Sequence, residues 1–266
     1  MVKYIFSLFI AVICSCQVQA AYRGELRIAT YIEEPFSYIK NNELVGENIE
    51  IAKLLAKSIN LDPIFIHCPF ARCLSMVKHG QADMIFGLRK FPEREIDLTF
   101  LSPAYMIQHY PLRFFTLKSS HQSITKFDDL TKLTVGILRG ATYFDQFDHN
   151  KTIKKVALTS RVQLVNMLLK GRIDTFLERE ESIKPLVSQN DYKNKFALEN
   201  YQYDRASASY IAISKHSKIQ SYSKKLSDNL AQLIQDGSLK KVMIDRSNPL
   251  KSNENTNKNT NKNKDN

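Results

Sequence analysis

Short apolar runs alternate with amphipathic stretches along most of this 266-residue chain. The runs "ELRIAT" (25–30), "PIFIHC" (63–68) and "ADMIFGL" (82–88) have the length and composition of buried strands. Between them, residues 47–61 carry apolar side chains at helical spacing, and residues 71–80 predict a short helix that ends at Gly80. This alternating order predicts a largely parallel sheet with helices on both faces.

The second half of the chain repeats this plan. Strands are expected at 132–138 and 173–178, with a helix between them over 159–171 that begins at an N-cap, Thr159 or Ser160. The segments "VKHGQADMIF" and "LLKGRIDTFL" share a glycine and an aspartate at matching positions, Gly80 and Asp83 in one and Gly171 and Asp174 in the other. Any helix-to-strand turn can hold the glycine, but the matched aspartate and element order favour two lobes built alike.

Ligands of open α/β sheets bind outside the carboxyl ends of the strands. Four segments follow predicted strand ends, and if the lobes face each other they share one cleft: "TYIEEPF" (30–36), "GLRKFPER" (87–94), "LRGATYF" (138–144) and "ERE" (178–180). The second gathers cationic side chains. It is either a solvated basic loop or a site that holds an anion.

Both ends of the chain differ from the body. The first 20 residues hold one lysine, an apolar run from Tyr4 to Cys14 and a "VQA" ending, which indicates a cleaved secretory signal peptide. An alternative is a lipoprotein signal that leaves Cys16 as a lipidated N-terminus. Residues 249–266 are rich in asparagine and lysine and predict a disordered tail.

The cysteines and the charge limit the function classes. Cleavage after residue 20 leaves Cys68 and Cys73, which in an oxidising compartment predict a disulfide; the alternative is two buried free thiols. The net charge of +11 is scattered rather than clustered, so we expect no nucleic-acid partner. Neither a zinc spacing nor a nucleotide loop occurs, so we expect no metal and no cofactor.

From Leu26 to Arg246 the order of motifs resembles the bacterial extracellular solute-binding proteins of family 3, the polar-amino-acid type. The resemblance rests on five segments: "EEPFSYIKNNELVGENIEIAKLLAK", "GQADMIFGLRKFPERE", "FLSPAYM", "ITKFDDLTKLTVGILRGATYF" and "LIQDGSLKKVMID". It implies a periplasmic, two-lobed protein that closes on a small solute with a carboxylate and delivers it to an ABC importer. We expect a monomer.

The resemblance also implies how the chain is divided. The first lobe comprises 21–110 and 208–248, and the second comprises 111–207. The hinge then has two crossings, near Tyr110–Phe114 and near Ser207–Tyr210.

The resemblance places Arg94 where the family holds a ligand carboxylate. A guanidinium stays charged, and its fork matches two carboxylate oxygens. The alternative is a salt bridge to a neighbouring acid, Glu93, Glu95 or Asp97.

Three more positions follow from the same match. Thr142 corresponds to a hydroxyl at the start of a second-lobe helix, where free N–H groups attract an anion, although it can also be a simple N-cap. Phe70 lies where the family has an aromatic platform, although a buried phenylalanine needs no function. Arg72 adds a cation beside it, or is an exposed helix residue.

The sequence also departs from the family pattern. Arg89, next to Gly87, replaces a small hydroxyl residue. Arg179 aligns with the family's acidic residue that binds the α-ammonium group of the ligand. If the alignment is shifted by one position, Glu178 takes that role instead. Glu33 stands close to where an aspartate ends the first strand. The sequence therefore predicts a binding site for a ligand carboxylate, and it does not decide whether the protein also binds an ammonium group.

Two other functions stay open. A periplasmic dehydratase acting on a cyclic carboxylate would need an acid–base carboxylate, and Glu33 or Glu178 could serve. A ligand-binding partner of a separate sensor is the third class. We expect a binding protein rather than an enzyme.

Overall fold

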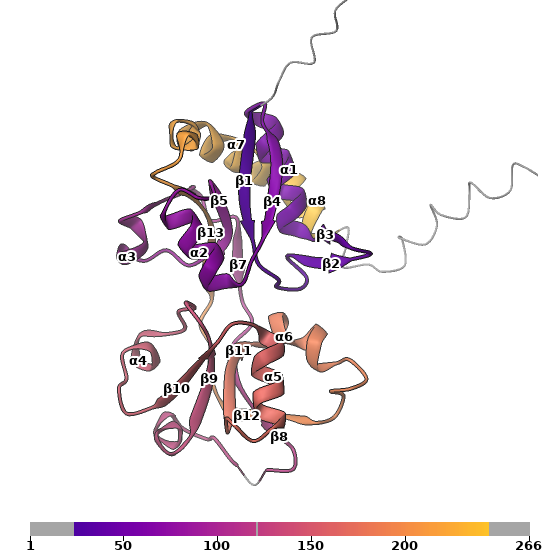
Figure 1. Cartoon of the computed structure of the whole chain (residues 1–266), viewed down its shortest axis with the longest axis vertical. Helices are drawn as coiled ribbons and strands as arrows, with labels where there is room; N and C mark the ends of the chain where they lie inside the picture. The colour runs from indigo at the N-terminus through magenta and orange to yellow at the C-terminus, as the bar shows by residue number, and fades with distance from the viewer. Residues whose placement is uncertain (1–23, 121, 245–266) are drawn as a thin grey trace, which may run out of the picture.

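The computed structural model describes residues 24–120 and 122–244 (Figure 1). The predicted signal peptide, the alternative lipid site at Cys16 and the predicted tail at 249–266 lie outside these residues. None of the helices in the described ranges is long and apolar enough to cross a bilayer.

One mixed sheet forms the core of the first lobe, which is the upper body in Figure 1. Its parallel part follows the sequence prediction, with β1 (Glu25–Thr30) between β4 (Asp62–His67) and β5 (Met84–Leu88). Three antiparallel strands extend it: β13 (Ser207–Ser214), β6 (Leu98–Phe100) and β7 (Met106–Gln108). A small hairpin lies apart, made of β2 (Tyr38–Lys40) and β3 (Glu43–Val45).

Helices cover both faces of this sheet because residues of β1 alternate between them. Leu26 and Ile28 pack under one group of helices: α1 (Glu47–Ser58), α7 (Ser223–Gln235) and α8 (Ser238–Ile244). Ala29 faces the opposite side, under α2 (Phe70–Lys78). The short helix α3 (Pro92–Glu95) follows β5, and a 3-10 helix spans Lys218–Tyr222.

The second lobe has the same parallel core, with β9 between β10 and β11. Its strand order is β10 (Lys154–Leu158), β9 (Thr134–Leu138), β11 (Thr175–Arg179), β8 (Leu112–Leu117) and β12 (Phe196–Tyr203). One face packs against α5 (Arg161–Leu169) and α6 (Glu180–Val187). The other packs against α4 (Asp145–Asp148) and a 3-10 helix at Phe127–Lys132.

The chain crosses between the two sheets twice, once between β7 and β8 and once between β12 and β13. The prediction of a two-lobed α/β fold with a two-crossing hinge is confirmed. The parallel pairing covers three of the six strands in the first sheet and three of the five in the second, because the segments beside the crossings add antiparallel strands. The lobe boundaries in the sequence stay a prediction.

The repeated glycine and aspartate have the same structural role in both lobes. Gly80 and Gly171 follow their helices with φ of 70° and 63°, a conformation that glycine adopts without steric cost. Asp83 accepts a hydrogen bond from the backbone N–H of Arg27 at 2.8 Å, and Asp174 accepts one from Thr134 at 2.7 Å. Each aspartate therefore fixes the start of one parallel strand beside another.

Cys68 and Cys73 form the predicted disulfide, with their Cα atoms 5.4 Å apart. The bridge joins the segment after β4 to the first turn of α2.

Candidate functional site

A cavity of about 90 Å³ lies between the lobes, and we call it the inner cavity. It is lined from the first lobe by residues that follow β1 and β5, and from the second by residues that follow β9 and end β11. Eight of the nine predicted site residues line it: Glu33, Phe70, Gly87, Arg89, Arg94, Thr142, Glu178 and Arg179. Their shared location follows from the rule that parallel strands present their carboxyl ends at one edge.

Arg94 and Arg89 form the cationic wall of the first lobe. Arg94 is buried on α3 and donates to the carbonyl of Arg89 at 2.9 Å and to that of Gly140, across the cleft, at 3.3 Å. Arg89 donates to the carbonyl oxygens of Thr142 and Tyr143 in the second lobe. Both guanidinium groups also lie over the ring of Phe91, 5.0 and 5.6 Å from its centroid, a cation–π arrangement that holds them close.

Arg179 supplies a third cation at the end of β11. It is buried, and its guanidinium donates to the carbonyl of Tyr110 and, at 3.0 Å, to the hydroxyl of Ser207. Both partners lie beside the crossings between the lobes. Arg179 therefore links the second lobe to the hinge.

Burial dominates the ionisation of these three arginines. It lowers the pKa of Arg89, Arg94 and Arg179, and the positive charge of Arg89 lowers the last two further. Nearby carboxylates offset this effect only in part, among them Glu33 and Glu178 beside Arg179. A further anion in the cavity would favour the cationic forms of the arginines.

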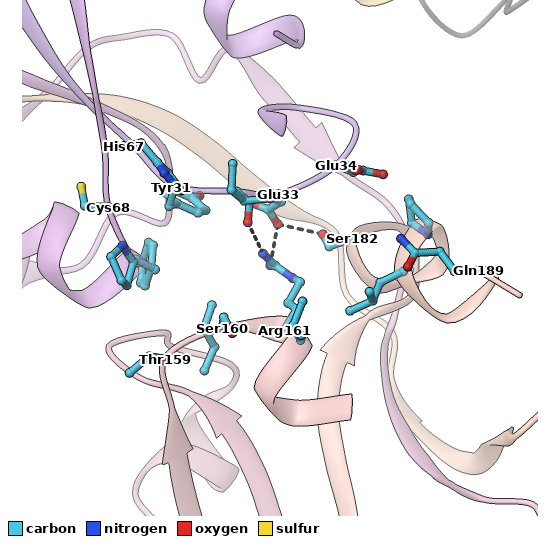
Figure 2. Close-up of a pocket in the computed structure, with 17 residues that line it drawn as sticks. Tyr31, Glu33, Glu34, His67, Cys68, Thr159, Ser160, Arg161, Ser182 and Gln189 are labelled. Carbon is cyan, nitrogen blue, oxygen red and sulfur yellow. Dashed lines mark hydrogen bonds and ion pairs between the residues drawn. The ribbon is translucent and has the colours of Figure 1, made fainter. Parts of the chain in front are cut away.

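A fourth arginine, Arg161, begins α5 and reaches across the cleft, as Figure 2 shows. Its guanidinium lies 2.9 Å from the Glu33 carboxylate and 3.3 Å from that of Glu178, and it also donates to the carbonyl of Ile32. Ser182 of α6 donates to the same Glu33 oxygen at 2.7 Å. Glu33 is thus held by two side chains of the opposite lobe.

The charges of Arg161 and Glu178 shift each other's pKa. Burial opposes the charge of Arg161, but Glu178 and Glu33 outweigh it and raise the pKa of the guanidinium. Burial raises the pKa of Glu178, and the charge of Arg161 only partly offsets this. Both carboxylates are committed to an ion pair with Arg161, so neither is free as the acid–base group that a dehydratase would need.

Gly87 and Phe70 shape the cavity floor. Gly87 has φ of 76°, and a Cβ there would overlap the Tyr31 hydroxyl, so glycine lets this tyrosine approach the strand end. The Tyr31 ring meets the Phe70 ring edge-on, with centroids 4.8 Å apart. The two rings form an aromatic part of the cavity lining on the first lobe.

Two predicted residues lie in settings that differ from the expectation. Thr142 lines the inner cavity, but α4 begins three residues later at Asp145 and is capped by Phe144. Thr142 is therefore not at the helix start, and the argument from free N–H groups was wrong. Arg72 is exposed on α2 and lines neither this cavity nor its neighbour.

A larger cavity of about 520 Å³ adjoins the first, and we call it the outer cavity (Figure 2). The two share five lining residues, among them Glu33 and Arg161. The rest of the outer cavity has a mixed lining, in which apolar residues such as Ile32, Val162 and Leu186 stand beside polar ones such as Glu34 and Gln189. Of these two cavities, the inner one alone is lined by Arg89, Arg94 and Arg179.

The sequence reasoning missed Arg161 as a site residue. The signal was present, because Arg161 follows the N-cap Ser160 directly after β10, at the carboxyl end of a parallel strand. Tyr31, Tyr143 and Gln108 also line the inner cavity and were not predicted. Within the described ranges, no group of three or more potential ligand side chains is arranged to hold a metal ion.

Two α/β lobes that meet around a charged cavity, joined by a two-crossing hinge, define a two-lobed solute-binding protein. The family model "Bacterial extracellular solute-binding proteins, family 3" matches residues 26–244. The chain belongs to this family, whose members bind solutes rather than catalyse reactions.

Curated relatives and solved structures agree with this assignment. The "Probable amino-acid-binding protein YxeM" of Bacillus subtilis is 23% identical over 80% of each chain. The "ABC transporter arginine-binding protein 1" of Escherichia coli is 29% identical over 55% of this chain and 58% of its own. The structure described as an ancestral arginine-binding protein bound to arginine has a TM-score of 0.71 and 23% identity, covering 84% of this chain and 98% of that one.

Proposed function

We propose that this chain captures a small carboxylate-bearing solute, an amino acid or a related acid, between its lobes and delivers it to an ABC importer. The coupling to an importer is supported by the Escherichia coli relative, which is named as an ABC transporter protein. We further propose that the protein is exported through its N-terminal segment, acts in the periplasm and is a monomer.

The observation that carries the proposal is a set of arginines in the inner cavity, of which Arg94 and Arg179 are buried and Arg89 is half-buried. Among the described residues, Arg89, Arg94 and Arg179 make no ion pair, and their donors reach carbonyl groups and one hydroxyl. A carboxylate would accept two parallel hydrogen bonds from a guanidinium. Because the arginines come from both lobes, such a ligand would favour closure.

The experiment has two steps. A thermal-shift screen of amino acids, dicarboxylates and small cyclic acids identifies a ligand, because a solute that binds only the folded state raises the midpoint. Calorimetry then compares wild type with Arg94→Ala. Truncating a buried, charge-paired guanidinium costs about 2–5 kcal/mol, so binding should weaken more than tenfold.

The exposed Lys225 provides the control, and Lys225→Ala should bind like wild type. Equal affinities of Arg94→Ala and wild type would show that the arginine is structural and that the strand end is only a solvated basic loop.

A further inference from the structure

The four arginines of the inner cavity differ in their partners. Arg161 is held between two carboxylates, those of Glu33 and Glu178. In the part of the chain that the structure describes, the other three have no acidic partner in ion-pair contact. Four arginines and two glutamates line the cavity, a formal excess of two positive charges.

The carboxylates of the cavity already hold a cation that belongs to the chain itself. The Arg161 guanidinium bridges them from the start of α5, and its side chain is only 13% exposed. A ligand ammonium would have to displace this guanidinium or lie among the remaining arginines, and both are unfavourable.

The three arginines without an ion pair fall into two groups. Arg89 and Arg94 lie over the same Phe91 ring on the first lobe. Arg179 comes from the end of β11 in the second lobe and donates to Tyr110 and Ser207 beside the crossings. Because all three line one cavity, a ligand with two separated anionic groups can contact Arg89 and Arg94 with one group and Arg179 with the other.

The inner cavity is small, at about 90 Å³, and adjoins the larger outer cavity. A ligand held only among the arginines of the inner cavity is therefore a short-chain diacid.

We infer that the solute is a small dicarboxylic acid without an ammonium group, and that Arg161 serves as a built-in cation for the two carboxylates of the cavity. The inference rests on the proposed function and specifies its substrate class. It assigns Arg161 as a specificity-determining residue: with its guanidinium in place, the cavity favours dianions over zwitterions.

The test is calorimetry of the purified chain with a matched series of probes. Glutarate and succinate carry two carboxylates, glutamate adds an ammonium to glutarate, and glutamine replaces one carboxylate of glutamate by an amide. At least one of the two diacids should bind at least tenfold more tightly than glutamate, and glutamine should bind more weakly still. Glycerol 3-phosphate carries its charge on one centre and should bind more weakly than that diacid.

A variant of Arg161 distinguishes a role of this residue in ligand specificity from a purely structural role. Arg161→Gln leaves Glu33 and Glu178 free to accept an ammonium, so the ratio of glutarate to glutamate affinity should fall at least tenfold. Loss of structure alone would weaken both ligands equally and leave the ratio unchanged. The exposed Arg172 provides the control, and Arg172→Gln should keep the wild-type ratio.

Three outcomes would overturn the inference. They are binding of glutamate or glutamine that is as tight as that of the better diacid, preference for the phosphate ester, and an unchanged ratio in Arg161→Gln. Amino-acid binding that still depends on Arg94 would leave the proposed function standing. Failure of every solute in both the screen and this series would overturn the two together.

Discussion

At the level of single residues, guanidinium groups determine the electrostatic character of the cleft. Removing a charge from water costs several kcal/mol even after the protein relaxes. Ion pairs with two carboxylates offset this cost for Arg161. Arg94 and Arg179, by contrast, are buried with only carbonyl and hydroxyl partners. Folding alone gives no reason to bury cations in this way, so the residues are better explained by an anion they receive.

The raised pKa of Glu178 leads to a prediction about pH. Because burial raises this pKa, the folded state holds the proton more tightly than the unfolded state. Glu178 then contributes stability at low pH that is lost as pH rises through its folded pKa. The melting temperature of wild type relative to Glu178→Gln should therefore fall between pH 4 and pH 7, by a few degrees for each kcal/mol or so.

Scanning calorimetry of both proteins across this pH range is the measurement. Glu43→Gln, at an exposed residue of the β2–β3 hairpin, serves as the control and should track wild type. A difference that stays constant or grows with pH would show that Glu178 has a low pKa in the folded protein.

Residues in the internal repeat, and residues that directly follow a strand, could be predicted from the sequence. Contacts between residues of different lobes could not. Asp83 and Asp174 stand at matched positions because each closes one strand onto another within its own lobe. The pairing of Arg161 with Glu33 joins residues 128 positions apart, so only the folded arrangement defines it. Arg89 illustrates the same limit, since its carbonyl partners lie in the other lobe.

At the level of elements, five of the six parallel strands were predicted, whereas β10 and the antiparallel strands were not. Strands β1, β5, β9 and β11 are apolar runs bounded by turns, and they occur close to where the pattern predicted them. Strands β8, β12 and β13 lie beside the crossings and pair with non-consecutive partners. Their position depends on how the lobes close, which local patterns do not encode.

The bridge between Cys68 and Cys73 fixes the segment that carries Phe70 into the cavity. It closes a loop of six residues, for which the chain-entropy relation gives about 2 kcal/mol of stabilisation. We expect the double variant Cys68→Ser and Cys73→Ser to melt roughly 4–8 °C below wild type.

Mass spectrometry of the non-reduced protein should find no free thiol at these positions, and calorimetry should measure the change in melting temperature. Reduction of wild type should reproduce the shift, and the same treatment of the double variant should not change it. Two free thiols in the exported protein would contradict the prediction.

At the level of the whole molecule, polar contacts of a few side chains join the lobes away from the hinge. Arg89 and Arg94 reach from the first lobe to backbone carbonyls of the second, and Arg161 and Ser182 reach back to Glu33. Gly140 contributes a close approach, because a Cβ there would lie 3.4 Å from Ala71 of the opposite lobe. The equilibrium between open and closed forms therefore depends on a small set of identifiable contacts.

Glu33 is the residue at which this dependence can be measured. It accepts from both Arg161 and Ser182 and is 12% exposed, so Glu33→Gln breaks a largely buried ion pair between the lobes. Breaking such a pair costs about 3 kcal/mol or more, which changes a two-state ratio roughly 100-fold. Without added solute, small-angle X-ray scattering should give a larger radius of gyration for Glu33→Gln than for wild type. Asp228→Asn removes an exposed pair with Lys224 within α7 and should leave the scattering unchanged. Identical profiles of Glu33→Gln and wild type would show that the hinge alone, and not the Arg161 contact, sets the distance between the lobes.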